Sequence, residues 1–160
     1  MILRSRIDIS LPPDKVWEML RYAEYMELWN PKCVSCPSLG RELQVGDTFS
    51  ATFKLTKEGV SDCEVLALEP CQRITIRHRP REMKGYVDET YHLLPRKNGQ
   101  TTRVEQVLDV THSSIPRWAQ ALMYFLNRFG RKMGDGPLEG LRDAAIAQAG
   151  MRSGQRGGYA

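Results

Sequence analysis

The chain has 160 residues, of which 41% are hydrophobic and 26% are charged, and its formal net charge is +4. These values are typical of one globular domain and exclude a disordered or fibrous chain. The Lys and Arg residues are scattered among nearly as many acidic residues, so we expect no nucleic-acid partner. The first residues lack the apolar core of a signal peptide, and no run approaches the roughly 18 apolar residues of a membrane span. We therefore expect a cytoplasmic protein without an integral membrane segment.

The segment from Ile7 to Lys32 predicts a strand followed by two helices. Apolar and polar residues alternate from Ile7 to Leu11, as in a half-buried strand, and Pro12-Pro13 then favours entry into a helix. The apolar residues of that helix share one face, and a second short helix follows it. We expect this unit to contribute shape rather than chemistry.

The middle of the chain predicts consecutive strands that are separated by turn sequences. Lys57-Glu58-Gly59 and Asn98-Gly99 are typical hairpin turns. The predicted strands cover Thr48 to Leu55, Val60 to Leu68, Arg73 to Arg79, Tyr86 to Leu94 and Thr102 to Thr111.

From Ile115 the apolar period becomes helical and predicts a long amphipathic helix. Its stripe consists of Trp118, Leu122, Phe125, Phe129 and Met133. The sequence Gly134-Asp135-Gly136-Pro137 predicts a kink or break, and the stripe resumes at Leu138. Residues 150–160 are rich in glycine and have nothing to bury, so we expect a single domain over residues 1–149 and a disordered tail after it.

The four cysteines stand at positions 33, 36, 63 and 71. Cys33 and Cys36 form one CxxC motif, but no second motif completes a zinc ribbon, and the three histidines lack metal-binding spacing. We therefore expect no metal and no cofactor. Incidental thiols are the favoured interpretation, and a redox role of Cys33 and Cys36 stays open.

The predicted order of elements, with several short motifs, resembles the polyketide cyclase/dehydrase and lipid-transport superfamily, also called START-like or SRPBCC. The motifs are Val16-Trp17, Trp29-Asn30-Pro31, Val45-Gly46-Asp47, Leu68-Glu69-Pro70, Arg73-Ile74, Leu93-Leu94-Pro95 and Thr102-Arg103-Val104. The resemblance covers roughly residues 3–148. It implies an α+β helix-grip fold, in which a curved antiparallel sheet of six or seven strands wraps around a long C-terminal helix, with two short helices after the first strand.

The resemblance also implies an internal cavity, between the sheet and the long helix, that holds a hydrophobic small molecule. Combined with the strand pattern, it predicts a lining of Trp29, Phe49, Phe53, Ile76, His78, Glu89, Tyr91, Gln106, Leu108, Leu122, Phe125 and Phe129. Trp17, Trp29 and Trp118 are each placed where a helix must pack, so we expect core positions for them. Trp29 also lies beside the expected entrance of the cavity.

Strand parity places His78 and Glu89 on the same inward face, with Tyr91 and Gln106 beside them. A carboxylate bonded to an imidazole in a dry pocket can act as a general base, and a phenol can stabilise an oxyanion, so His78, Glu89 and Tyr91 are the candidate catalytic residues. The alternatives are that Glu89 is simply paired with His78 or an arginine, or that the group recognises a polar part of a ligand.

The predicted function is binding or transport of a lipid, polyketide or aromatic molecule, and the alternative is a polyketide cyclase or dehydratase. Superfamily membership alone does not decide between them. The stretch from Tyr124 to Phe129 is apolar on more than one side of its helix, which leads to the hypothesis of a homodimer.

Overall fold

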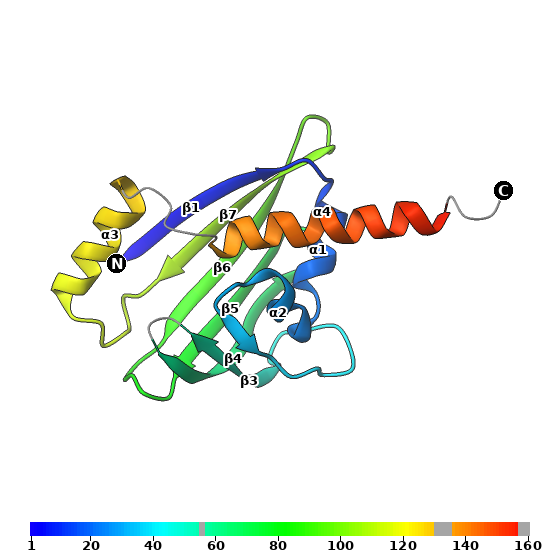
Figure 1. Cartoon of the computed structure of the whole chain (residues 1–160). Coiled ribbons are helices and arrows are strands. Elements are labelled where there is room, and N and C mark those ends of the chain that lie inside the picture. The colour runs from blue at the N-terminus through cyan, green and yellow to red at the C-terminus, as the bar shows by residue number, and fades with distance from the viewer. Residues whose placement is uncertain (55–56, 130–135, 157–160) are drawn as a thin grey trace.

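Within the part of the chain that the structure describes, seven strands form one antiparallel sheet in the order β1-β7-β6-β5-β4-β3-β2 (Figure 1). The computed structural model describes residues 1–54, 57–129 and 136–156, with residues 126–129 and 153–156 described by their backbone alone. The strands are β1 (Ile2–Ile9), β2 (Cys33–Ser35), β3 (Thr48–Lys54), β4 (Glu58–Glu69), β5 (Arg73–Pro80), β6 (Val87–Arg96) and β7 (Thr101–Asp109). The predicted number and direction of strands are confirmed.

The helices gather mainly on the concave face of the sheet (Figure 1). They are α1 (Pro13–Leu20), the 3-10 helix η1 (Ala23–Tyr25), α2 (Met26–Trp29), α3 (Arg117–Phe129) and α4 (Pro137–Arg156). Helix α4 lies across the sheet and packs against α1 and α2, whereas α3 lies at the end of the sheet next to the N-terminus (Figure 1). This is the helix-grip arrangement of an α+β fold, as predicted.

The core forms where the apolar faces of the sheet and the helices meet. Helix α1 has a proline in its first turn, where the missing amide proton costs nothing, and it buries Val16, Trp17, Met19 and Leu20. Helix α4 adds Leu138, Leu141 and Ala145 from its inner side. Trp17 and Trp29 are buried, so the core positions predicted for these two residues are confirmed.

Helix α4 begins at Pro137, where the sequence predicts a break in the C-terminal helical region. A proline is tolerated in the first turn of a helix but not in its interior, so the chain starts a new helix there. The part of the predicted interruption that precedes Gly136 lies outside the described residues, as does Met133 of the predicted stripe. The helix that crosses the sheet is therefore α4, not the segment that follows Ile115.

The predicted disordered tail from Gly150 is wrong for residues 150–156, because α4 continues to Arg156. The helix projects past the sheet there (Figure 1). An ion pair between Arg152 Nη1 and Glu18 Oε2, at 2.6 Å, joins this part of α4 to α1. A helix satisfies its own backbone hydrogen bonds and can continue without burying a face. Residues 157–160 lie outside the described residues.

Candidate functional site

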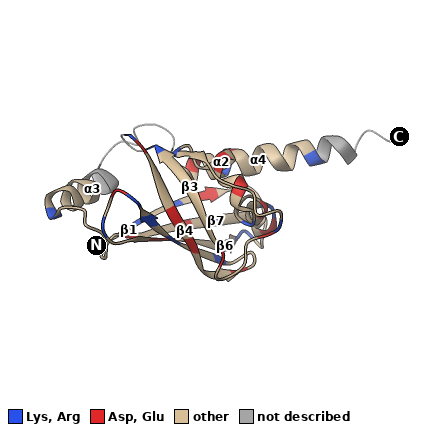
Figure 2. Ribbon diagram, turned by 90° about the horizontal axis from the view of Figure 1, so that it is seen from below, with Lys and Arg blue, Asp and Glu red and all other residues tan. Residues whose placement is uncertain are grey.

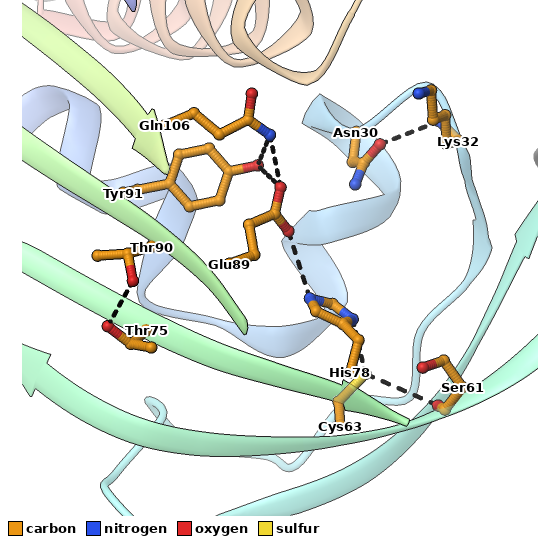
Figure 3. A network of polar contacts seen from close by, with 10 residues as sticks. All are labelled: Asn30, Lys32, Ser61, Cys63, Thr75, His78, Glu89, Thr90, Tyr91 and Gln106. Carbon is orange, nitrogen blue, oxygen red and sulfur yellow. Dashed lines mark hydrogen bonds and ion pairs between the residues drawn. The ribbon is translucent and has the colours of Figure 1, made fainter. Parts of the chain in front are cut away.

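Five polar side chains form a continuous row across four neighbouring strands on the concave face of the sheet (Figure 3). They are Cys63 on β4, His78 on β5, Glu89 and Tyr91 on β6, and Gln106 on β7. Cys63 lies opposite His78, and Tyr91 lies opposite Gln106, so each of these pairs points to the same face. We call these five residues the polar chain.

Glu89 is the centre of the polar chain (Figure 3). Its Oε2 lies 3.3 Å from Nε2 of His78. Its Oε1 accepts a hydrogen bond of 2.7 Å from the Tyr91 hydroxyl and another from Nε2 of Gln106. Gln106 also donates to the Tyr91 hydroxyl at 3.2 Å. On the other side, Nδ1 of His78 lies 3.5 Å from Sγ of Cys63. The predicted grouping of His78, Glu89, Tyr91 and Gln106 is present in the structure.

The polar chain lies in an apolar interior. Tyr91 and Cys63 are among the most deeply buried side chains, and Glu89 is also buried. Ile74 and Ile76 lie opposite Tyr91 and Glu89 on β5. A charged carboxylate in such surroundings is stable only when it is paired and hydrogen-bonded. The three neighbours of Glu89 meet this requirement and hold its carboxylate in one position.

The contacts of His78 and Glu89 favour an imidazolium that faces a carboxylate. Burial by itself would lower the pKa of His78, but the contacts with Cys63 and Glu89 outweigh it and raise this pKa well above its usual value. Burial would raise the pKa of Glu89, yet the close contact with His78 and its charge, with the hydrogen bonds from Tyr91 and Gln106, lower it overall. Both shifts favour the charged forms of the two groups at neutral pH.

Two aromatic contacts position the polar chain. The rings of Trp29 and Tyr91 meet edge to face with centroids 5.4 Å apart. Phe53 meets the imidazole of His78 in the same way at 5.6 Å. Such contacts restrict the orientation of both rings. Burial and the Glu89 carboxylate also raise the pKa of Tyr91, so its hydroxyl keeps its proton and donates.

Most of the other predicted lining residues on the sheet lie near the polar chain. Phe49 lies opposite Cys63, and Leu108 lies opposite Glu89.

Leu122 and Phe125 do not lie near the polar chain. Both are on α3 and are exposed, so their predicted place in the lining is wrong. The core position predicted for Trp118 is wrong for the same reason. Helical spacing places these residues on one face of α3 but does not determine what that face meets. The side chain of Phe129 lies outside the described residues.

The interior beside α4 is filled by side chains, because Trp29, Tyr91 and Leu141 are almost completely buried. The concave face is less covered toward the end of the sheet where α3 lies. Its inward residues there are only half-buried, and they are Ser5, Val87, Gln106 and Leu108. We call these four residues the open end of the concave face.

Two open hollows also occur on the described surface. One has a volume of about 260 Å³ and is lined by Arg4, Ser5, Arg6, Glu105 and Val107. The other has a volume of about 300 Å³ and is lined by Thr48, Phe49, Ser50, Asp62, Cys63 and Arg79. Both are open to solvent and include charged side chains in their lining, and they differ in this from the predicted apolar cavity.

Sequence reasoning missed Ser61 and Cys63 as members of this region. Both side chains are buried on the inward face of β4, where buried and half-buried residues alternate. The Oγ of Ser61 has no hydrogen-bond partner among the described residues. The period-2 pattern of β4 predicts the inward orientation of both residues, whereas the spacing between the cysteines gives no indication of it.

The CxxC motif forms a pair of neighbouring thiols at the edge of the sheet. An irregularity in the pairing of β2 with β3 between Cys33 and Ser35 lets Cys33 and Cys36 both point inward. The hydrogen bond with Cys36 lowers the pKa of Cys33, while the same bond and burial raise that of Cys36. All four cysteines are free thiols.

Among the described residues, no group of three or more His, Cys, Asp or Glu side chains is arranged to hold a metal ion.

Solved structures with the same fold support the architecture. Protein NE0264 from Nitrosomonas europaea is 14% identical, with a TM-score of 0.66 over 94% of this chain and 97% of its own. Protein MLL2253 from Mesorhizobium loti is 25% identical, with a TM-score of 0.56 over 89% of this chain and 97% of its own. DynU16, a protein from the dynemicin biosynthetic locus, is 17% identical, with a TM-score of 0.55 over 85% of this chain and 49% of its own.

Among proteins of curated function, none matches the sequence. The family model described as "Polyketide cyclase / dehydrase and lipid transport" matches residues 2–148. The match covers the sheet, the polar chain and most of α4. This chain therefore belongs to the polyketide cyclase / dehydrase and lipid transport family, whose fold binds hydrophobic ligands.

Proposed function

We propose that the protein binds a hydrophobic small molecule at the open end of the concave face and holds one oxygen of that molecule with the polar chain. The observation that carries this proposal is the contact of 3.3 Å between Nε2 of His78 and Oε2 of Glu89 inside an otherwise apolar face. Keeping two charges away from water is costly, and an apolar pair of similar size would often be more stable. Because stability alone does not require this pair, we attribute its presence to recognition of a ligand.

The chemistry of the site favours a ligand with a carbonyl, phenol or carboxylate oxygen. Charged His78 has two N–H donors, and its Nε2 faces Glu89 without a well-aligned hydrogen bond. The unsatisfied hydroxyl of Ser61 is a second buried group that can bond to a ligand oxygen. Val87 and Leu108, which are half-buried, provide apolar contact for the rest of the molecule.

The alternative is a cyclase or dehydratase that uses His78 or Glu89 as a general base. A general base works best when its pKa is near the working pH. Here the pKa of His78 is raised and that of Glu89 is lowered, so at neutral pH the imidazole already carries a proton and the carboxylate is a weak base. This charge state favours binding over general-base catalysis.

The binding proposal is tested with the fluorescent probe anilinonaphthalene sulfonate, which combines an aromatic body with one anionic group. We expect His78→Gln to weaken probe binding by about tenfold, which is the loss of one charge-assisted hydrogen bond. The matched control is His92→Gln on the same sheet, because His92 lies outside the polar chain. Equal affinities for the wild type and both variants would contradict the proposal.

The enzyme alternative makes a different prediction for the same residues. A polyketide-like ketone substrate would lose turnover by about 100-fold or more in both His78→Gln and Glu89→Gln, the scale of general acid–base catalysis. Under the binding proposal, the wild type returns such a ketone unchanged. Analysis of the ketone by mass spectrometry after incubation separates the two functions.

A further inference from the structure

Helix α3 presents its apolar face to solvent. Trp118, Leu122 and Phe125 follow one another at steps of four and three and lie on one side of the helix. Their side chains are exposed to 73%, 51% and 60%, respectively, and Tyr124 beside them is also exposed. Among the residues of α3 whose side chains are described, the half-buried ones are Ala119, Gln120 and Met123, on the other side. We call Trp118, Leu122, Tyr124 and Phe125 the α3 surface.

This orientation is the reverse of that of an ordinary surface helix, which buries its apolar side. Contiguous exposed apolar residues of this size usually mark a surface that another body covers. Helix α3 contacts β1 at the end of the sheet, away from α4 (Figure 1). The α3 surface is therefore accessible from outside the molecule and separate from the polar chain.

The composition of the segment that contains α3 indicates what covers this surface. Residues 110–134 contain 4 of the 23 Lys and Arg residues and none of the 19 Asp and Glu residues, so the rest of the chain is balanced at 19 of each. The whole formal net charge of +4 thus belongs to the segment that contains α3. In Figure 2, the part of α3 that is not grey has blue but no red, whereas the strands carry both colours.

We propose that α3 docks on the surface of an anionic phospholipid bilayer. A helix with aromatic and aliphatic residues on one side, in a segment that contains basic but no acidic residues, is suited to lie in the plane of a bilayer, with its apolar face at the boundary of headgroups and acyl chains. Each Lys or Arg near an anionic surface strengthens the attraction. Among the described helices, none is long and apolar enough to cross a membrane, so the contact is peripheral.

A second copy of the chain is a weaker candidate for the same surface. A symmetric dimer through α3 would bring two identical patches together. Both patches belong to segments with four basic residues and no acidic residue, so a symmetric contact through this segment would supply no opposite charge. Anionic lipid instead neutralises the basic residues and covers the apolar ones.

The chain contains its own reporter for this docking. Trp118 is exposed to 73%, whereas Trp17 and Trp29 are exposed to only 5% and 3%. Insertion into lipid moves the Trp118 indole alone from water to an apolar medium. We therefore expect a shift of tryptophan emission to shorter wavelength with vesicles of phosphatidylcholine and phosphatidylglycerol, and none with phosphatidylcholine alone. High salt should reverse the shift.

Cosedimentation with the same vesicles tests the surface itself. The double variant Trp118→Ser with Leu122→Ser should bind the anionic vesicles at least about tenfold more weakly. The matched control is Leu28→Ser, which removes an apolar side chain that is exposed to 64% on α2, and it should bind as the wild type does. Circular dichroism establishes that all variants are folded.

Three results would overturn the proposal. These are equal binding to neutral and anionic vesicles, undiminished binding by the double variant, and absence of binding by the wild type. In the last case, an α3-dependent dimer in sedimentation equilibrium would assign the surface to a second copy. The measurement requires no ligand at the polar chain, so failure of the proposed function leaves it valid.

Discussion

Nε2 of His78 lies 3.3 Å from Oε2 of Glu89, although the two residues are not directly opposite each other in the sheet. His78 on β5 pairs with Val87, and Glu89 on β6 pairs with Ile76, so the two side chains meet diagonally on the concave face. Diagonal neighbours of this kind are within reach of long side chains. The proposed recognition of a ligand oxygen depends on this pair.

Removal of Glu89 should destabilise the protein strongly. Glu89→Ala leaves His78 and the Tyr91 hydroxyl buried without their partner, and breaking a buried pair costs about 3–5 kcal/mol. The matched control is Asp88→Asn on the other face, where Asp88 pairs with Arg77 at 2.7 Å in a more exposed place. That change should cost at most about 1 kcal/mol. Urea unfolding measures both, and equal losses would contradict a special role of Glu89.

Stability should fall as the pH rises from about 6.5 to about 10. The pKa of His78 is raised from 6.5 to about 10 in the folded state, so the folded protein holds this proton more tightly than the unfolded chain. The stabilisation is complete below pH 6.5 and is lost as the pH rises through about 10.

The variant His78→Gln removes the titrating group and should reduce this pH dependence, with His92→Gln as control. The free energy of unfolding at several pH values gives the comparison. The same slope in His78→Gln and the wild type would show that other groups cause it. At the acidic end, Glu89 has a lowered pKa, so its contribution is present above its unfolded pKa and is lost as the pH falls through the folded one.

Gly140 should be irreplaceable at the contact between α4 and α2. A Cβ atom at this position would overlap the backbone carbonyl oxygen of Trp29, which cannot move like the end of a flexible side chain. Gly140→Ala should therefore lower stability by about 2 kcal/mol or more through overpacking. It should also disturb Trp29 and hence its contact with Tyr91.

Gly150 on the same helix is the matched control, because a Cβ there meets nothing within 4 Å. Gly150→Ala should raise stability by up to about 1 kcal/mol through the better helix propensity of alanine. Thermal unfolding of the two variants gives changes of opposite sign. A neutral Gly140→Ala would mean that α4 packs less closely on α2.

The sequence was most informative in the strands, where inward and outward residues alternate. Parity alone places His78, Glu89, Tyr91 and Gln106 on one face, because a strand leaves only two choices for each side chain. Cys63 follows the same rule, so β4 also contained the signal for its contact with His78. The resemblance to a known family implied the antiparallel sheet. Short connections favour the neighbouring positions of β3 to β7, but they do not account for the pairing of β1 with β7.

The sequence was least informative about helices. The spacing of Trp118, Leu122 and Phe125 identifies one face of α3, but a periodic pattern is the same whether that face meets the core, a bilayer or another protein. The length of α4 past Gly150 was missed for a related reason. This last part of α4 is joined to α1 by the ion pair between Arg152 and Glu18. The two residues are far apart in the sequence, so the sequence pattern does not indicate their contact.

The charge state of His78 tests the central claim most directly. Nitrogen NMR of the imidazole at pH 8 distinguishes an imidazolium from a neutral ring, and His92 and His112 provide internal references. We predict that His78 is charged at pH 8 and becomes neutral there in Glu89→Gln. A neutral imidazole in the wild-type protein at this pH would contradict the charged pair on which the proposed recognition of a ligand oxygen depends.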